Sequence, residues 1–85
     1  MGMQEIDVRR LMEKLGRSGV TVLLKIDEER MAKGGEPWTL LMSGPGVGGL
    51  EYIRAESSSL GDCLEQGFAQ LRTCPGDWDW LTEIA

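Results

Sequence analysis

Histidine is absent from this 85-residue sequence, and its absence removes several classes of functional site. Without histidine there is no common general base, no Ser-His or Cys-His nucleophile pair and no common zinc-binding spacing. Carboxylates are frequent, but no pair of them falls on one predicted buried face, as tuned acid and base chemistry requires. We therefore expect no enzymatic activity, no catalytic residue, no metal and no cofactor.

Cysteine is also scarce, with only Cys63 and Cys74 in the chain. On one continuous helix their Cα atoms would stand ~16 Å apart, whereas a disulfide needs them within ~7 Å. The sequence shows no signal-peptide pattern and no apolar run near the ~18 residues of a membrane span. These features favour reduced thiols, no membrane contact and a cytoplasmic location.

Basic residues are few in the second half of the chain. Residues 1–42 hold seven basic and seven acidic residues, whereas residues 43–85 hold only Arg54 and Arg72 against seven acids, which accounts for the net charge of −5. Nucleic-acid binders usually carry the opposite sign, so nucleic acid is an unlikely partner. The acidic half is either a solubilising surface or a surface that attracts a basic partner.

The periodicity of apolar residues predicts a helix over residues 3–16, which ends at Gly16 or Gly19. Val8, Leu11 and Leu15 fall on one face of this helix. A second face carries a short basic stripe formed by Arg10, Lys14 and Arg17.

Three β-strands are expected over residues 20–26, 37–43 and 50–56, joined as an antiparallel meander. Alternation directs the even-numbered residues of the first strand, from Val20 to Ile26, toward one face, and Asp27 to Arg30 extend that strand. In the third strand, Tyr52 and Ile53 compete for the inward position. The opposite face of the sheet carries Leu23 and Leu41, and the C-terminal tail is one candidate to cover it.

A second helix is predicted over residues 60–71, with Ser59 as its N-cap and Asp62 as the partner in a capping box. Gly67 lies inside this helix and indicates close packing. After a turn at Pro75 and Gly76 comes a short helical tail. We expect Trp80 to face inward and Trp78 to lie near the surface.

These elements predict a single α+β domain over residues 1–85, a two-layer α-β-β-β-α arrangement with a three-stranded meander and a short helical C-terminal tail. The order is similar to that of double-stranded RNA-binding domains. Those domains need a lysine cluster at the start of the second helix, and the matching segment, SSSLGDCLEQG, has no basic residue.

The glycine-rich segment GPGVGG, residues 44–49, matches G-x-G-x-x-G in letters only. The dinucleotide-binding form requires a helix after the glycines, and here a strand follows. We interpret this segment as a hairpin loop, and its only candidate role is that of a mobile flap.

The sequence therefore favours a small acidic protein-binding domain, of the kind found among inhibitors that occupy a basic or nucleic-acid-binding surface. Anti-CRISPR and other phage anti-defence proteins, antitoxins and immunity proteins are examples of such a role. The expected partner contacts are Glu51, Glu56, Asp62, Glu65, Asp77, Trp78 and Asp79. One alternative is a degenerate nucleic-acid binder that uses Arg10, Lys14 and Arg17. Another is a structural homodimer formed through the open sheet face.

Overall fold

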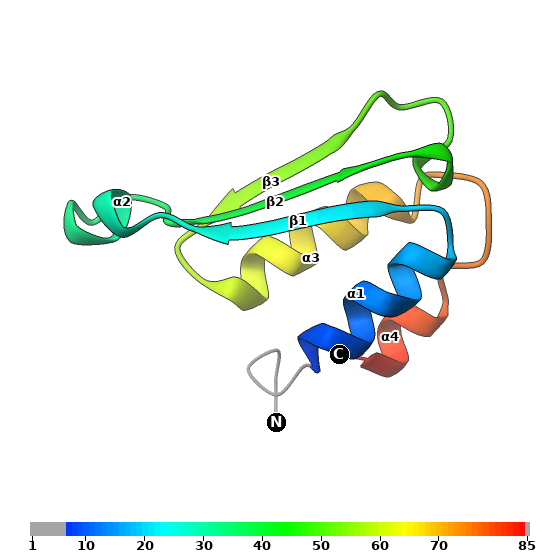
Figure 1. Cartoon of the computed structure of the whole chain (residues 1–85), viewed down its shortest axis with the longest axis horizontal. Helices are drawn as coiled ribbons and strands as arrows, with labels where there is room; N and C mark the ends of the chain where they lie inside the picture. The colour runs from blue at the N-terminus through cyan, green and yellow to red at the C-terminus, as the bar shows by residue number, and fades with distance from the viewer. Residues whose placement is uncertain (1–6, 85) are drawn as a thin grey trace.

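The computed structural model describes residues 7–84 and confirms the predicted α+β architecture. One antiparallel sheet contains, in chain order, β1 (Thr21–Ile26), β2 (Trp38–Ser43) and β3 (Ile53–Ser57). The helices on one side of this sheet are α1 (Val8–Arg17), α3 (Leu60–Leu71) and α4 (Trp80–Ile84) (Figure 1). The apolar core lies between the two layers.

Helix α1 begins where the sequence supplies an acceptor for its free N–H groups. The Asp7 carboxylate accepts a hydrogen bond from the Arg10 N–H at 3.1 Å, which makes Asp7 the N-cap. Leu11 and Leu15 are buried, as the periodicity predicts. The predicted part over residues 3–6 lies outside the described residues. The chain leaves the helix through Gly19, whose φ of 85° suits glycine.

Helix α3 has the bounds that its periodicity predicts, and Ser59 caps it by accepting the Asp62 N–H at 3.2 Å. The prediction that Asp62 completes a capping box is wrong. The Ser59 N–H, which would donate to Asp62 in such a box, donates to Ser57 Oγ at 3.4 Å instead. The close packing expected at Gly67 is confirmed: a Cβ atom there would overlap the side chain of Leu40.

The extension of the first strand over Asp27 to Arg30 is wrong. A short helix, α2 (Glu28–Ala32), occupies this segment, because the Asp27 carboxylate accepts the N–H groups of Glu29 and Arg30 at 3.0 and 3.2 Å. Ile26 was expected inside but is 49% exposed. Ile26 is exposed because α1 leads into the start of β1, whereas Ile26 stands at the far end of the strand.

Strand β3 begins at Ile53, later than the predicted residue 50. Of the two residues considered for the inward position, Ile53 takes it, because Ile53 is fully buried and Tyr52 is 54% exposed. Tyr52 precedes the strand, in the connection from β2.

The glycine-rich segment is a loop between β2 and β3, as the sequence predicts, and it packs against two other parts of the chain. It contains a 3₁₀ helix, η2 (Pro45–Val47), in which Val47 is fully buried. The Gly46 N–H donates to the Gly19 carbonyl at 2.8 Å, and Cys74 Sγ donates to the Val47 carbonyl at 3.1 Å. The loop is therefore held from both sides.

The surface position expected for Trp78 is wrong, and the inward position expected for Trp80 is only partly confirmed, because Trp80 packs against the core but stays partly exposed. Trp78 is buried, and its Nε1–H donates to the Cys74 carbonyl at 3.2 Å, whereas Trp80 is only half-buried. The reason is the turn at Gly76, whose φ of 122° folds the Trp78 ring back against it. The tail does not cover the open sheet face, because α4 lies beside α1 on the helical side (Figure 1).

Candidate protein-binding face

One side of the sheet is uncovered by any helix of the described residues (Figure 1). The strand register places two rows of side chains on it, because alternate residues of a strand share a face. One row contains Leu23, Leu41 and Arg54, and the next contains Lys25, Thr39 and Glu56. Leu23 is 61% exposed, so apolar surface is left open to solvent at this face.

Five of these residues line a shallow hollow of about 220 Å³, which we call the sheet hollow: Leu23, Lys25, Thr39, Leu41 and Arg54. Binding sites for whole small molecules usually measure ~300 to 1,000 Å³. The sheet hollow is smaller and matches one or two side chains of a partner better than a cofactor.

An ion cluster closes one side of this face and joins α2 to β3. Arg30 Nη1 and Arg54 Nη2 each lie 2.8 Å from Glu56 Oε2. These hydrogen bonds, the one from Arg30 most strongly, lower the pKa of Glu56 from 4.5 to about 2. The carboxylate of Glu56, which the sequence predicts to contact a partner, is thus already paired with two arginines of the same chain.

Two polar groups of the sheet hollow have no such partner. Lys25 enters no ion pair among residues 7–84. The hydroxyl oxygen of Thr39 is buried and makes no hydrogen bond within the same residues. A buried hydroxyl without a hydrogen bond costs ~1 to 3 kcal/mol. The hollow therefore presents the exposed ammonium of Lys25 beside the apolar side chains of Leu23 and Leu41, whereas the Thr39 hydroxyl oxygen is inaccessible from outside.

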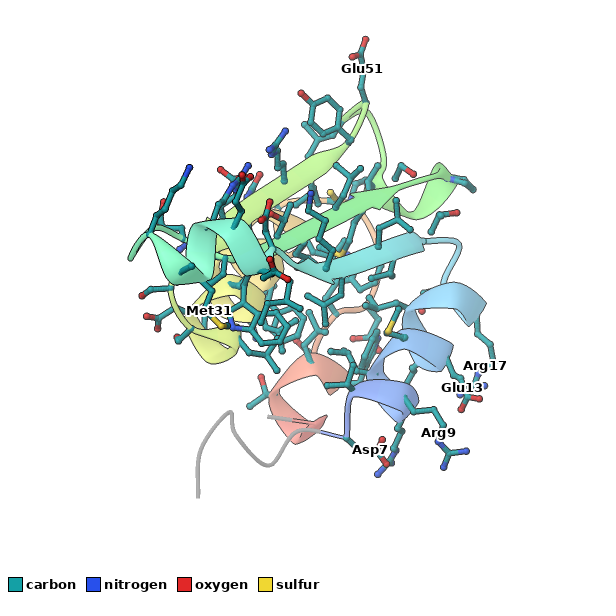
Figure 2. The ribbon with its side chains drawn as sticks, turned by 60° about the vertical axis from the view of Figure 1, so that its left-hand side comes forward. Asp7, Arg9, Glu13, Arg17, Met31 and Glu51 are labelled. Carbon is teal, nitrogen blue, oxygen red and sulfur yellow. The ribbon has the colours of Figure 1, made fainter. Side chains whose placement is uncertain are left out.

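The other acidic residues expected at a binding site lie on separate elements. Glu51 stands at the tip of the β2–β3 connection (Figure 2), whereas Asp62 and Glu65 are exposed on α3. Asp77 and Asp79 are exposed in the connection to α4. Trp78 is buried behind them, where it cannot reach a partner. The structure does not gather these residues into one surface.

The basic stripe of α1 is divided in a similar way. Lys14 lies over the ring of Trp80, with Nζ 5.1 Å from the ring centroid, while Arg10 and Arg17 are exposed. Arg9, Glu13 and Arg17 project from α1 on one side, so this face has mixed charge (Figure 2).

The sequence interpretation named Leu23 and Leu41 on this face but none of the polar residues of the hollow. For two of these polar residues the signal was present, because strand alternation places Lys25 beside Leu23 and Thr39 beside Leu41. The register that brings Arg54 level with Leu41 was the missing information.

No helix within residues 7–84 is long and apolar enough to cross a membrane. Nor does that part of the chain contain a group of three or more side chains suited to hold a metal ion. Comparisons with protein-family models, with curated proteins and with solved structures find no significant match.

Proposed function

We propose that this protein is a non-catalytic domain that binds another protein through the sheet hollow. The observation that carries the proposal is the exposed ammonium of Lys25, which enters no ion pair among residues 7–84, beside the open apolar surface of Leu23 and Leu41. Uncovered apolar surface with a polar rim is typical of a protein contact.

The chemistry of the hollow favours a partner segment that joins a carboxylate to an apolar side chain. A carboxylate would pair with the exposed ammonium of Lys25. The apolar side chain would lie on Leu23 and Leu41, in the neighbouring row. An extended segment presents residues i and i+2 on one face with the same spacing as these rows. The expected partner therefore carries Asp or Glu two residues from Leu, Ile or Val.

Local charge supports this partner although the whole chain is acidic. Lys25, Arg30 and Arg54 lie in or beside the hollow, against the carboxylates of Glu56 and Asp27. The lining of the hollow itself holds two basic side chains, Lys25 and Arg54, and no carboxylate.

Both cysteines are free and buried, which agrees with a location in the reducing cytoplasm.

A second candidate is the inhibitor role, in which the domain covers a basic or nucleic-acid-binding surface, as anti-CRISPR-like proteins, antitoxins and immunity proteins do. Asp62 and Glu65 support it, because both are exposed on α3 and neither enters an ion pair among the described residues.

Selection of a random peptide library on the immobilised protein separates these two candidates. If the sheet hollow is the site, the enriched peptides contain an acidic residue two positions from an aliphatic one. Enrichment of basic peptides would support the α3 surface and overturn the proposal, as would the absence of any enrichment.

Matched variants then locate the contact. Lys25→Glu should weaken binding of the selected peptide by about tenfold or more, equivalent to ~1.4 kcal/mol. Lys33→Glu makes the same charge change at the exposed C-cap of α2, outside the hollow, and should bind like the unaltered protein. Equal binding by Lys25→Glu and Lys33→Glu would contradict the assignment.

A further inference from the structure

The outer edge of β1 is unpaired among the described residues. β1 pairs only with β2, and the Asp27 N–H donates to the Pro37 carbonyl at 2.9 Å, in line with the β1–β2 register. Backbone groups of alternate residues point to opposite sides of an antiparallel strand. The odd-numbered residues therefore face β2, and Val22, Leu24 and Ile26 direct their N–H and C=O groups outward.

This edge has little protection against pairing. Natural proteins usually shield edge strands with charges, proline, bulges or a covering segment. The strand TVLLKI contains one charge, Lys25, and no proline. Leu23 and Ile26 are 61% and 49% exposed, so the edge is apolar on both of its faces.

We propose that β1 binds β1 of a second copy of this chain, in antiparallel orientation about a two-fold axis at Leu24. This register places Leu24 opposite Leu24 of the second copy and Val22 opposite Ile26. The outward N–H and C=O groups of all three residues are then paired. On the open face Leu23 lies opposite Lys25 of the second copy, so the two lysines are not directly opposed.

Charge complementarity at the ends of β1 favours a second copy over an unrelated strand. Helix α2 follows one end of β1 and has Glu28 and Glu29 in its first turn, whereas α1 precedes the other end and has the exposed Arg17 in its last turn. Figure 1 shows these helices at opposite ends of the strand. Antiparallel pairing brings the acidic end of each copy to the basic end of the other.

This inference is independent of the proposed function. The pairing uses the edge of β1, whereas peptide binding uses the face of the sheet. In the dimer the two sheet hollows lie on the same side of one continuous sheet, on either side of the two-fold axis. Loss of dimerisation would leave each hollow in place, so the two proposals can fail separately.

Sedimentation equilibrium of the full chain over micromolar to millimolar concentrations tests the dimer. We expect a mass near twice 9.4 kDa for the unaltered protein. Ile26→Pro removes one outward N–H without removing a bond to β2, and it should weaken dimerisation by more than tenfold. Ile26→Lys should act in the same direction, because it places a charge opposite Val22. Circular dichroism would verify that both variants are folded.

Two control variants locate the interface. Leu50→Lys changes an exposed leucine away from β1 and should dimerise normally. Leu41→Lys alters the centre of the open face and should also dimerise. A monomeric unaltered protein at millimolar concentration would overturn the proposal. Undiminished dimerisation of folded Ile26→Pro, or a dimer lost only with Leu41→Lys, would also overturn it.

Discussion

Lys14 of α1 lies over the indole of Trp80 in α4, with Nζ 5.1 Å from the ring centroid. Trp80 in turn contacts Trp78, with ring centroids 6.2 Å apart and planes tilted by 50°. The contact joins the beginning of the described chain to its end. It also withdraws Lys14 from the basic stripe that the sequence suggested for nucleic acid.

Replacement of Lys14 should weaken this link. Lys14→Met keeps the hydrocarbon stem and removes the charge, so it should lower the free energy of unfolding by ~0.5 to 1 kcal/mol. Urea denaturation measures the difference. Arg17→Met, at an exposed position of the same helix, is the control and should have a smaller effect. Equal losses in the two variants would mean that the contact with Trp80 adds no stability.

The two tryptophans should differ strongly in what they contribute to folding. Trp78 is 7% exposed and bonds the Cys74 carbonyl, so Trp78→Ala should cost ~3 to 5 kcal/mol. Trp80 is half-buried, and Trp80→Ala should cost less. Thermal unfolding of both variants provides the comparison. A larger loss for Trp80→Ala would contradict the burial described for this tail.

Gly67 and Gly16 offer a matched pair of helical glycines. A Cβ at position 67 would overlap Leu40 and approach Met42 Cε to 3.2 Å, so Gly67→Ala should destabilise the protein by ~1 to 3 kcal/mol. A Cβ at position 16 meets nothing within 4 Å, so Gly16→Ala should be neutral or stabilise by up to ~1 kcal/mol. Changes of the same sign in denaturant midpoint would count against the packing at Gly67.

The ion cluster around Glu56 should make stability depend on pH in a defined window. The arginines lower the pKa of Glu56 from 4.5 to about 2 in the folded state. Its contribution is therefore fully present above pH 4.5 and is lost as the pH falls toward 2. Glu56→Gln should be less stable than the unaltered protein at neutral pH, and the difference should shrink below pH 4.5. A difference that stays constant to pH 2 would contradict this.

The elements that sequence periodicity identified were those with a long apolar stripe. Helix α3 is the clearest example, because its buried side recurs over three turns and Ser59 marks its start. Helix α2 was missed because its five residues bury none of their own side chains. Its only signal was Asp27 followed by helix-forming residues. The burial of Val47 was not predicted either, because Val47 is a single apolar residue within a glycine-rich segment and belongs to no periodic pattern.

Positions that depend on a single turn or on strand register could not be read from residue order. The burial of Trp78, which the sequence did not predict, follows from the backbone conformation at Gly76 and from one hydrogen bond to the Cys74 carbonyl. The sheet hollow likewise required the register of three strands. Sequence alternation indicated an uncovered apolar face, but only the register places Arg54 on it beside Leu41.

The most direct measurement of the central claim is a titration of ¹⁵N-labelled protein with a short peptide that has glutamate two residues from leucine, followed by NMR. We expect the largest amide shifts at the sheet hollow, at Leu23, Lys25, Thr39, Leu41 and Arg54, and we expect these shifts to be lost in Lys25→Glu. Shifts centred on Asp62 and Glu65 of α3, or no saturable shifts at millimolar peptide, would contradict binding through the sheet hollow.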